Sequence, residues 1–356
     1  MTLVCKKISC EDEAFNNIVI ELKTDNLSRS NMPKMIVGTG LSASFQVPGM
    51  KQLAAELKNK LDRHDDSRVR TLWREKVPAI DKFGLEDGLK SLNSSEEILI
   101  NEIKKITTAF ILQEEQKLLC DIYNKKSGFE HLLMYLKETC SINYGILDIM
   151  TPNYDRIIEI LCDKCNISVI TGFEGQIFRR FNATNLKKPD IQYNLKNNFF
   201  VRLFKPHGSI NWIERNGDEY LINDYELLSK YSDNIEIIAP GNSKYKEGML
   251  NNTFRTMRED FNELISDNAK PYSLFIYGYG FNDSHFNTVL FQNKYKKVLI
   301  LSKEIRDDVI DRATKNKNVT AFYQHDDKEY MIYKGENIEI DKSLWNIDVF
   351  ADVFLG

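Results

Sequence analysis

The 356-residue sequence has few cysteines, no long apolar run and no excess of charge of one sign. Six cysteines are too sparse for the disulfide framework of a small secreted protein. No window approaches the about 18 apolar residues of a membrane span, and the opening stretch MTLVCKKISCEDEAF lacks a signal-peptide core. We therefore expect a cytoplasmic protein with no membrane partner. With 48 basic and 52 acidic residues, direct nucleic-acid contact is not expected.

Several motifs of site chemistry are missing as well. No GxxxxGK[ST] phosphate loop occurs, so we do not expect this chain to hydrolyse ATP. The histidines show no HExxH spacing, and Cys162-x-x-Cys165 is half of the four-cysteine set that a zinc ribbon needs. Because this pair falls on an expected helix, we interpret both residues as structural cysteines and expect no metal.

Short apolar runs bounded by turn residues predict the strands of an α/β fold. Helices are expected at 11–23, 50–61 and 156–165, where apolar residues recur at helical spacing. Strands that alternate with helices favour an open, mostly parallel sheet. The expected strands are 35–37, 145–150, 199–204, 235–239, 272–277 and 298–301.

Residues 62–140 are rich in Glu, Lys, Leu and Ile and predict a helical insertion beside the sheet. Within it we expect a long amphipathic helix over 95–123, broken near Thr107-Thr108, and a second helix over 129–137. The length allows one large domain or two. We expect a single domain spanning 1–356 that contains this insertion.

The first candidate ligand loop, Gly38-Thr39-Gly40, follows an expected strand and precedes an expected helix. Glycine permits close approach of a ligand to the backbone, and the amides at such a turn can face a pyrophosphate. Ser42 adds a hydroxyl donor. A plain strand–helix turn explains the same residues equally well, and the sequence leaves both interpretations open.

Other polar residues also follow expected strands, at the edge where open α/β sheets bind ligands. Asn153 and Asp155 can serve a ligand, and they can equally be turn formers. His207 has a side chain suited to proton transfer, although a hydrogen-bonded structural histidine fits the position too. A second glycine-rich exit loop, 278–283, can receive the other half of an extended ligand.

Taken in order, these loops resemble the sirtuin-like family. The motifs are GTGLS (38–42), TPNYD (151–155), KPHGS (205–209) with Asn211-Trp212, and GYGFND (278–283). The closest resemblance is to bacterial sirtuin-like NAD hydrolases of antiphage defence, particularly the subunits that partner a HerA-type ATPase. The stretches TGFEGQIFRRF (171–181) and IIAPGNSKYKEG (237–248) match too, and the resemblance covers roughly 34–302.

The resemblance implies a Rossmann-like fold that binds NAD as its substrate. It implies that Asn153 positions the nicotinamide ribose or a water, that Asp155 meets the nicotinamide carboxamide, and that His207 is the general base. The residues implied to face the pyrophosphate and nearby ribose are Gly38, Thr39, Gly40 and Ser42. Those implied to line the adenosine half are Gly278, Gly280, Phe281, Asn282, Asp283 and Ser302.

Two departures from the protein-deacetylating sirtuins favour a hydrolase. The sequence has no paired CxxC…CxxC, and Val47-Pro48-Gly49-Met50 stands where those enzymes carry Pro-Asp-Phe-Arg. We therefore expect an NAD glycohydrolase that yields nicotinamide and ADP-ribose, acting in antiphage defence. By resemblance it forms a homo-oligomer and partners a HerA-type ATPase. An NAD-dependent protein deacylase and a non-catalytic subunit that senses NAD or ADP-ribose within an ATPase or nuclease complex remain alternatives.

Overall fold

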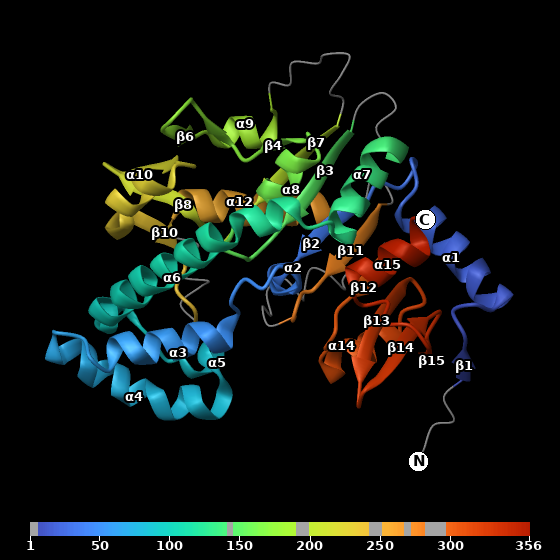
Figure 1. Ribbon diagram of the computed structural model, residues 1–356, viewed down its shortest axis with the longest axis horizontal. Coiled ribbons are helices and arrows are strands. Elements are labelled where there is room, and N and C mark those ends of the chain that lie inside the picture. The colour runs from blue at the N-terminus through green and yellow to red at the C-terminus, as the bar shows by residue number, and fades with distance from the viewer. Residues whose placement is uncertain (1–5, 141–144, 190–198, 242–250, 267–271, 282–296) are drawn as a thin grey trace.

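A computed structural model describes residues 6–140, 145–189, 199–241, 251–266, 272–281 and 297–356 (Figure 1). In this part of the chain ten strands form one sheet, in the order β1-β15-β14-β13-β12-β11-β2-β3-β7-β4. The bounds are β1 (Lys6–Ile8), β2 (Lys34–Val37), β3 (Gly145–Met150), β4 (Ser168–Ile170), β7 (Phe199–Phe204), β11 (Ser273–Tyr277), β12 (Lys297–Leu301), β13 (Val319–His325), β14 (Lys328–Tyr333) and β15 (Glu336–Ile340).

The seven strands from β4 to β13 in that order are parallel to one another, whereas β14 is antiparallel to both β13 and β15. The mostly parallel sheet and the α/β class are therefore confirmed. The antiparallel addition of β14 and β15 was not expected, because charged residues interrupt the apolar pattern in both segments.

Alternate residues of the central strands enter two different cores, as a strand buried on both faces requires. Val37 and Ile149 belong to one apolar cluster, and their neighbours Ile36 and Met150 belong to the other. The helices that contribute to the first cluster include α1 (Glu13–Asn26), α7 (Gly128–Cys140), α8 (Ile157–Lys164) and α15 (Ile347–Phe354). Those of the second are α9 (Ala183–Lys187), α12 (Asn252–Ser266) and α14 (Asp307–Thr314).

A smaller antiparallel sheet has the order β10-β8-β9-β6-β5. The strand expected over 235–239 lies in this sheet as β10 and not in the large sheet, and the other strands were not expected. Its strands are β5 (Phe173–Glu174), β6 (Arg179–Phe181), β8 (Gly208–Arg215), β9 (Asp218–Leu221) and β10 (Ile235–Ile237). The segments α10 (Tyr225–Lys230) and η2 (Ser232–Asn234) connect β9 to β10. Because β8 begins immediately after His207, this sheet anchors one of the predicted site residues.

Helices fill the expected insertion. They are α4 (Ser67–Phe83), α5 (Leu85–Gly88), η1 (Ser94–Glu96), α6 (Glu97–Asn124) and α7, and the insertion is preceded by the short α2 (Thr39–Ser44) and by α3 (Met50–Leu61). The predicted break at Thr107-Thr108 is wrong, since α6 runs through both residues. Thr108 instead donates its hydroxyl to the Lys105 carbonyl (3.0 Å), so the helix accommodates the polar side chain.

The long helix α6 runs from the helices α3 to α5 toward α8 (Figure 1), and its apolar residues belong to three clusters. Leu99 and Ile103 pack with α3 and α4, Ile111 packs beside the smaller sheet, and Ile122 enters the core that α7 and α8 share. The helical region is thus tied to both sheets. No helix in the described segments is long and apolar enough to cross a membrane.

Candidate functional site

The predicted loops leave the large sheet where its strand order reverses. From β2 the chain adds β3 and β7 on one side, and later adds β11, β12 and β13 on the other. Open α/β sheets bind ligands at such a reversal, outside the carboxyl ends of the strands. The exits of these parallel strands share one edge. We call this the carboxyl edge, and its residues are 38–42, 151–155, 205–209, 278–281 and 302.

Gly38 and Gly40 bring the β2 exit into backbone contact with the β11 exit. A Cβ on Gly38 would lie 2.4 Å from the Gly278 carbonyl oxygen, and one on Gly40 would lie 2.5 Å from Gly278 Cα. The amides of Gly38 and Gly40 donate to the carbonyls of Tyr277 (2.8 Å) and Gly278 (2.9 Å). Packing between the loops therefore explains both glycines. Pyrophosphate contact at this turn, where Thr39 is exposed, stays a prediction.

Three predicted residues from two distant loops form one hydrogen-bonded chain. Asn153 Nδ2 donates to the Gly38 carbonyl (3.0 Å) and to Ser42 Oγ (2.9 Å). Ser42 Oγ in turn donates to Asp155 Oδ2 (2.6 Å). All three side chains are buried. The structure thus unites Ser42, Asn153 and Asp155 although more than a hundred residues separate Ser42 from the other two.

The amide of Asn153 has a fixed orientation and one unused atom. Because the Gly38 carbonyl can only accept, the Asn153 nitrogen must face it, and Oδ1 points elsewhere. Within the described part of the chain nothing donates to this buried oxygen. Leaving a buried acceptor unsatisfied costs about 1–3 kcal/mol. The position therefore favours a ligand or water that donates a hydrogen bond.

Asp155 serves both the site and the turn that follows it. Its Oδ1 accepts from the Ile157 amide (3.2 Å) at the start of α8, so it is a turn former as well as a partner of Ser42. Burial raises the pKa of the Asp155 carboxyl, and the nearby Lys205 ammonium and the Ser42 hydrogen bond oppose that rise. Both interpretations that the sequence left open for this residue are compatible with its geometry.

A buried lysine that the sequence analysis did not single out connects the exits of β3 and β7. Lys205 Nζ donates to the Asp155 carbonyl (2.5 Å) and to Ser209 Oγ (2.8 Å), and it pairs with Glu159 (3.2 Å). Burying an ammonium is costly unless such partners compensate. The available signal was its place in KPHGS, two residues before the predicted catalytic histidine.

His207 lies in the same turn and is buried. The Gly208 amide donates to the Lys205 carbonyl (3.1 Å), and Gly208 has a φ of +82°, a conformation that favours glycine. The His207 carbonyl accepts from the Ile238 amide (2.9 Å), next to the smaller sheet. These contacts hold the His207 backbone at the carboxyl edge, and its role as general base stays a prediction.

The exits of β11 and β12 supply the remaining predicted residues. Ser302 Oγ contacts the Tyr279 carbonyl (3.3 Å), and the Phe281 ring packs on Tyr279 with centroids 5.2 Å apart. Phe281 has a φ of +55°, which is uncommon for a bulky residue. Gly280 is exposed at this edge. The other two predicted residues, Asn282 and Asp283, lie outside the described residues.

Cys162 and Cys165 pack in the core around the C-terminal end of α8. Burial raises the pKa of both thiols, that of Cys165 to about 11, and so disfavours the thiolate that metals bind. The structural interpretation of the pair is supported. Among the described residues, no group of three or more His, Cys, Asp or Glu side chains is arranged to hold a metal.

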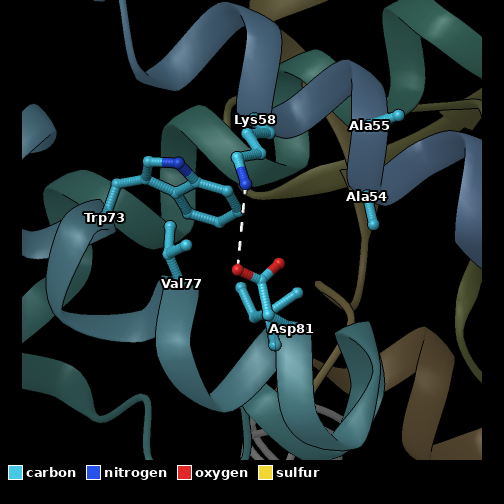
Figure 2. Close-up of a pocket in the computed structure, with 7 residues that line it drawn as sticks. Ala54, Ala55, Lys58, Trp73, Val77 and Asp81 are labelled. Carbon is cyan, nitrogen blue, oxygen red and sulfur yellow. Dashed lines mark ion pairs between the residues drawn. The ribbon is translucent and has the colours of Figure 1, made fainter.

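A cavity of about 160 Å³ opens between α3 and α4 (Figure 2). Ala54 and Ala55 leave room on α3, Trp73 contributes from α4, and Lys58 pairs with Asp81 (3.8 Å) across it. The cavity shares no residue with the loops described above, so it has no part in the candidate site.

Comparison with known protein families matches part of this chain to one family. Residues 148–322 match the model of the SIR2-like domain. The match begins within β3 and ends within β13, so it includes Asn153, Asp155 and His207 but not the glycine loop at 38–42. No curated protein matches the chain. SIR2-like domains act on NAD, so the match supports a sirtuin-like protein with an NAD-related function.

Proposed function

We propose that this chain, with its SIR2-like domain, is an NAD glycohydrolase that cleaves NAD to nicotinamide and ADP-ribose. The observation that carries the proposal is the environment of Asn153. Its nitrogen is held by Gly38 and Ser42, while its buried Oδ1 lacks a donor within the described structure. A ribose hydroxyl of NAD, or the attacking water, supplies the hydrogen bond that this oxygen needs.

Cleavage of the nicotinamide–ribose bond builds positive charge on the ribose, as in glycoside hydrolysis. Water adds its oxygen to C1′ while the bond to nicotinamide breaks and its electron pair leaves with the nicotinamide nitrogen. In this scheme Asn153 orients the water or the ribose, and His207 accepts the proton of the water. The Asp155 carboxylate, fixed by Ser42, meets the carboxamide of the leaving nicotinamide.

The hydrolase is favoured over the deacylase because the cysteine pair of α8 is buried in the core instead of being presented for metal binding. By resemblance, we further propose that the enzyme acts in antiphage defence as a homo-oligomer partnered by a HerA-type ATPase. A cytoplasmic location belongs to the same proposal.

Chromatography of NAD incubated with the chain, alone and with a HerA-type partner, tests the activity. We expect nicotinamide and ADP-ribose without added peptide. Formation of O-acetyl-ADP-ribose only with acetylated peptide would favour the deacylase. NAD binding without nicotinamide release in either mixture would favour the non-catalytic sensor.

His207→Ala should lower turnover by about a hundredfold to ten-thousandfold, the usual range for a positioned base, while NAD binding is partly kept. The matched control is His64→Ala, since His64 pairs with Glu102 (3.3 Å) in the helical region and contacts none of the site loops. Turnover of His207→Ala at the wild-type rate would refute the assignment of the base.

A further inference from the structure

Glu115 is a fully buried carboxylate in the middle of α6. Its Oε2 accepts from the backbone amide of Arg156 (2.5 Å), and its Oε1 accepts from Arg156 Nε (2.7 Å) and from the Tyr225 hydroxyl (3.0 Å). Arg156 Nη2 lies 2.6 Å from Oε1. One carboxylate therefore holds both the main chain and the guanidinium of a single residue.

That residue directly follows Asp155 in the β3 exit loop. Its guanidinium also lies over the Tyr225 ring, 4.5 Å from the centroid, and donates to the Asn223 carbonyl (3.4 Å). Glu115, Arg156 and Tyr225 thus bring together α6, the candidate site loop and α10. The main-chain bond matters most for the site, because it fixes the backbone one residue after the carboxylate that Ser42 contacts.

The helix that carries Glu115 is itself held on both sides of this position. Ile111 packs beside the smaller sheet, and Ile122 packs in the core of the large sheet. A buried charge pair with hydrogen bonds at this depth is costly to assemble, and hydrophobic residues of similar volume often replace such pairs without loss of stability. The pair is therefore weak evidence for a stabilising role.

We infer that Glu115 is a positioning residue, which holds the loop carrying Asn153 and Asp155 in place through the main chain and side chain of Arg156. The kinetic part of this inference rests on the proposed NAD hydrolysis. The structural part does not, because the backbone bond to the Arg156 amide can be measured without turnover.

Glu115→Gln tests both parts, since it keeps the shape of the side chain but presents an amide donor to a set of donors. The matched control is Glu96→Gln. Glu96 is also a buried carboxylate and pairs with Lys76 (2.6 Å), but it lies at the start of α6 and contacts no site loop. Hydrogen exchange of the 151–158 peptide and steady-state kinetics are measured for both variants.

We expect Glu115→Gln to speed exchange in this peptide by about tenfold or more and to lower kcat by up to about a hundredfold, the scale of a 1 Å misplacement. KM should change by less than about threefold if only the reacting geometry is disturbed. Tyr225→Phe, which removes one hydrogen bond of the set, should change kcat by less than Glu115→Gln does. Glu96→Gln should alter neither exchange of the peptide nor kcat.

Unchanged exchange of the 151–158 peptide in Glu115→Gln overturns the inference, and so does faster exchange spread evenly over the whole chain. If that variant does not fold, Glu115→Leu combined with Arg156→Met removes the pair without leaving a buried charge, and the same two readouts apply. A wild-type chain that releases no nicotinamide, alone or with its partner, overturns the proposed function instead. The exchange comparison then still decides whether Glu115 holds the loop.

Discussion

At the scale of one residue, Asp155 is a candidate site residue whose ionisation lowers the stability of the folded chain. Its carboxylate lies in a buried position, where Ser42 and the Ile157 amide each occupy one oxygen. Burial raises its pKa although the Lys205 ammonium is close. An ionised Asp155 at neutral pH therefore lowers the stability of the folded state. Carboxyl groups with shifted pKa values are common at binding and catalytic sites, so the shift is consistent with a functional role.

The raised pKa gives a signed prediction for stability. As pH rises above about 3.9, the ordinary pKa of aspartate, the unfolded chain loses this proton before the folded chain does. The folded state then binds more protons, so this group makes the unfolding free energy fall as pH rises through the raised pKa. The difference in unfolding free energy between wild type and Asp155→Asn should thus be smaller at pH 7 than at pH 4, measured by urea denaturation.

Asp341 provides the control for this measurement. Hydrogen bonds from Ser9 and the Cys10 amide lower the pKa of Asp341 to about 2, so its stabilisation is present above the ordinary pKa and is lost as pH falls toward 2. The difference between wild type and Asp341→Asn should not shrink between pH 4 and pH 7. If the difference in unfolding free energy between wild type and Asp155→Asn increases from pH 4 to pH 7, the pKa of Asp155 is not raised.

The sequence predicted the position of those candidate site residues that come directly after a strand. Ser42, Asn153 and His207 each follow a buried apolar run, so parallel pairing puts them at one edge. Glu115 was not predictable in this way, because nothing in its helical neighbourhood distinguishes it from the other glutamates of α6. Its partner lies 41 residues away, and that pairing depends on how the helix packs.

At the scale of elements, the contact between the β2 and β11 exits depends on glycine. Gly40→Ala would place a Cβ 2.5 Å from Gly278 Cα, and this neighbour is backbone, which cannot move aside as a flexible side chain could. We expect a loss of unfolding free energy of about 1–3 kcal/mol or more, with a parallel loss of NAD turnover as the two loops separate. Urea denaturation and the nicotinamide-release assay measure the two effects.

Gly49→Ala is the matched control for that substitution. Gly49 also precedes a helix and has a negative φ of −90°, but the nearest atom to an added Cβ is Gln52 Oε1 at 3.7 Å. Its cost should stay within about 1 kcal/mol, the typical effect of alanine at a helix N-cap. Equal losses in the two variants would mean that close loop packing is not what requires Gly40.

Helices and strands were predicted correctly where the segment had one clear pattern of apolar residues. The segments of β3, β7 and α3 were predicted with their observed bounds. The two strands are apolar except for one charged residue each, Asp148 and Arg202, and α3 has a clear helical period. Apart from β10, the strands of the smaller sheet were missed, because strands such as β9, with the sequence DEYL, are short and contain charged residues. Tertiary pairing, which no local window contains, makes such segments strands.

At the scale of the whole molecule, α6 makes separate unfolding of the helical region costly. Three tryptophans report on three clusters: Trp73 lies in the helical cluster, Trp212 in the cluster of the second sheet face, and Trp345 packs against that of the first face. Because α6 contributes Leu99 to the first of these and Ile122 to the last, melting the helical cluster would also expose part of the main core.

Single-tryptophan variants, made by replacing the other two with Phe, should therefore unfold in urea with coincident midpoints. Fluorescence of each variant gives the midpoint of its own cluster, and circular dichroism of the same samples corrects for any overall change in stability. A Trp73 transition at clearly lower urea than the other two would show that the helices from α3 to α5 form an independently unfolding unit. In that case unfolding of the helices α3 to α5 would leave the contact between Glu115 and Arg156 intact. Glu115 would then hold the loop only through the part of α6 that carries it.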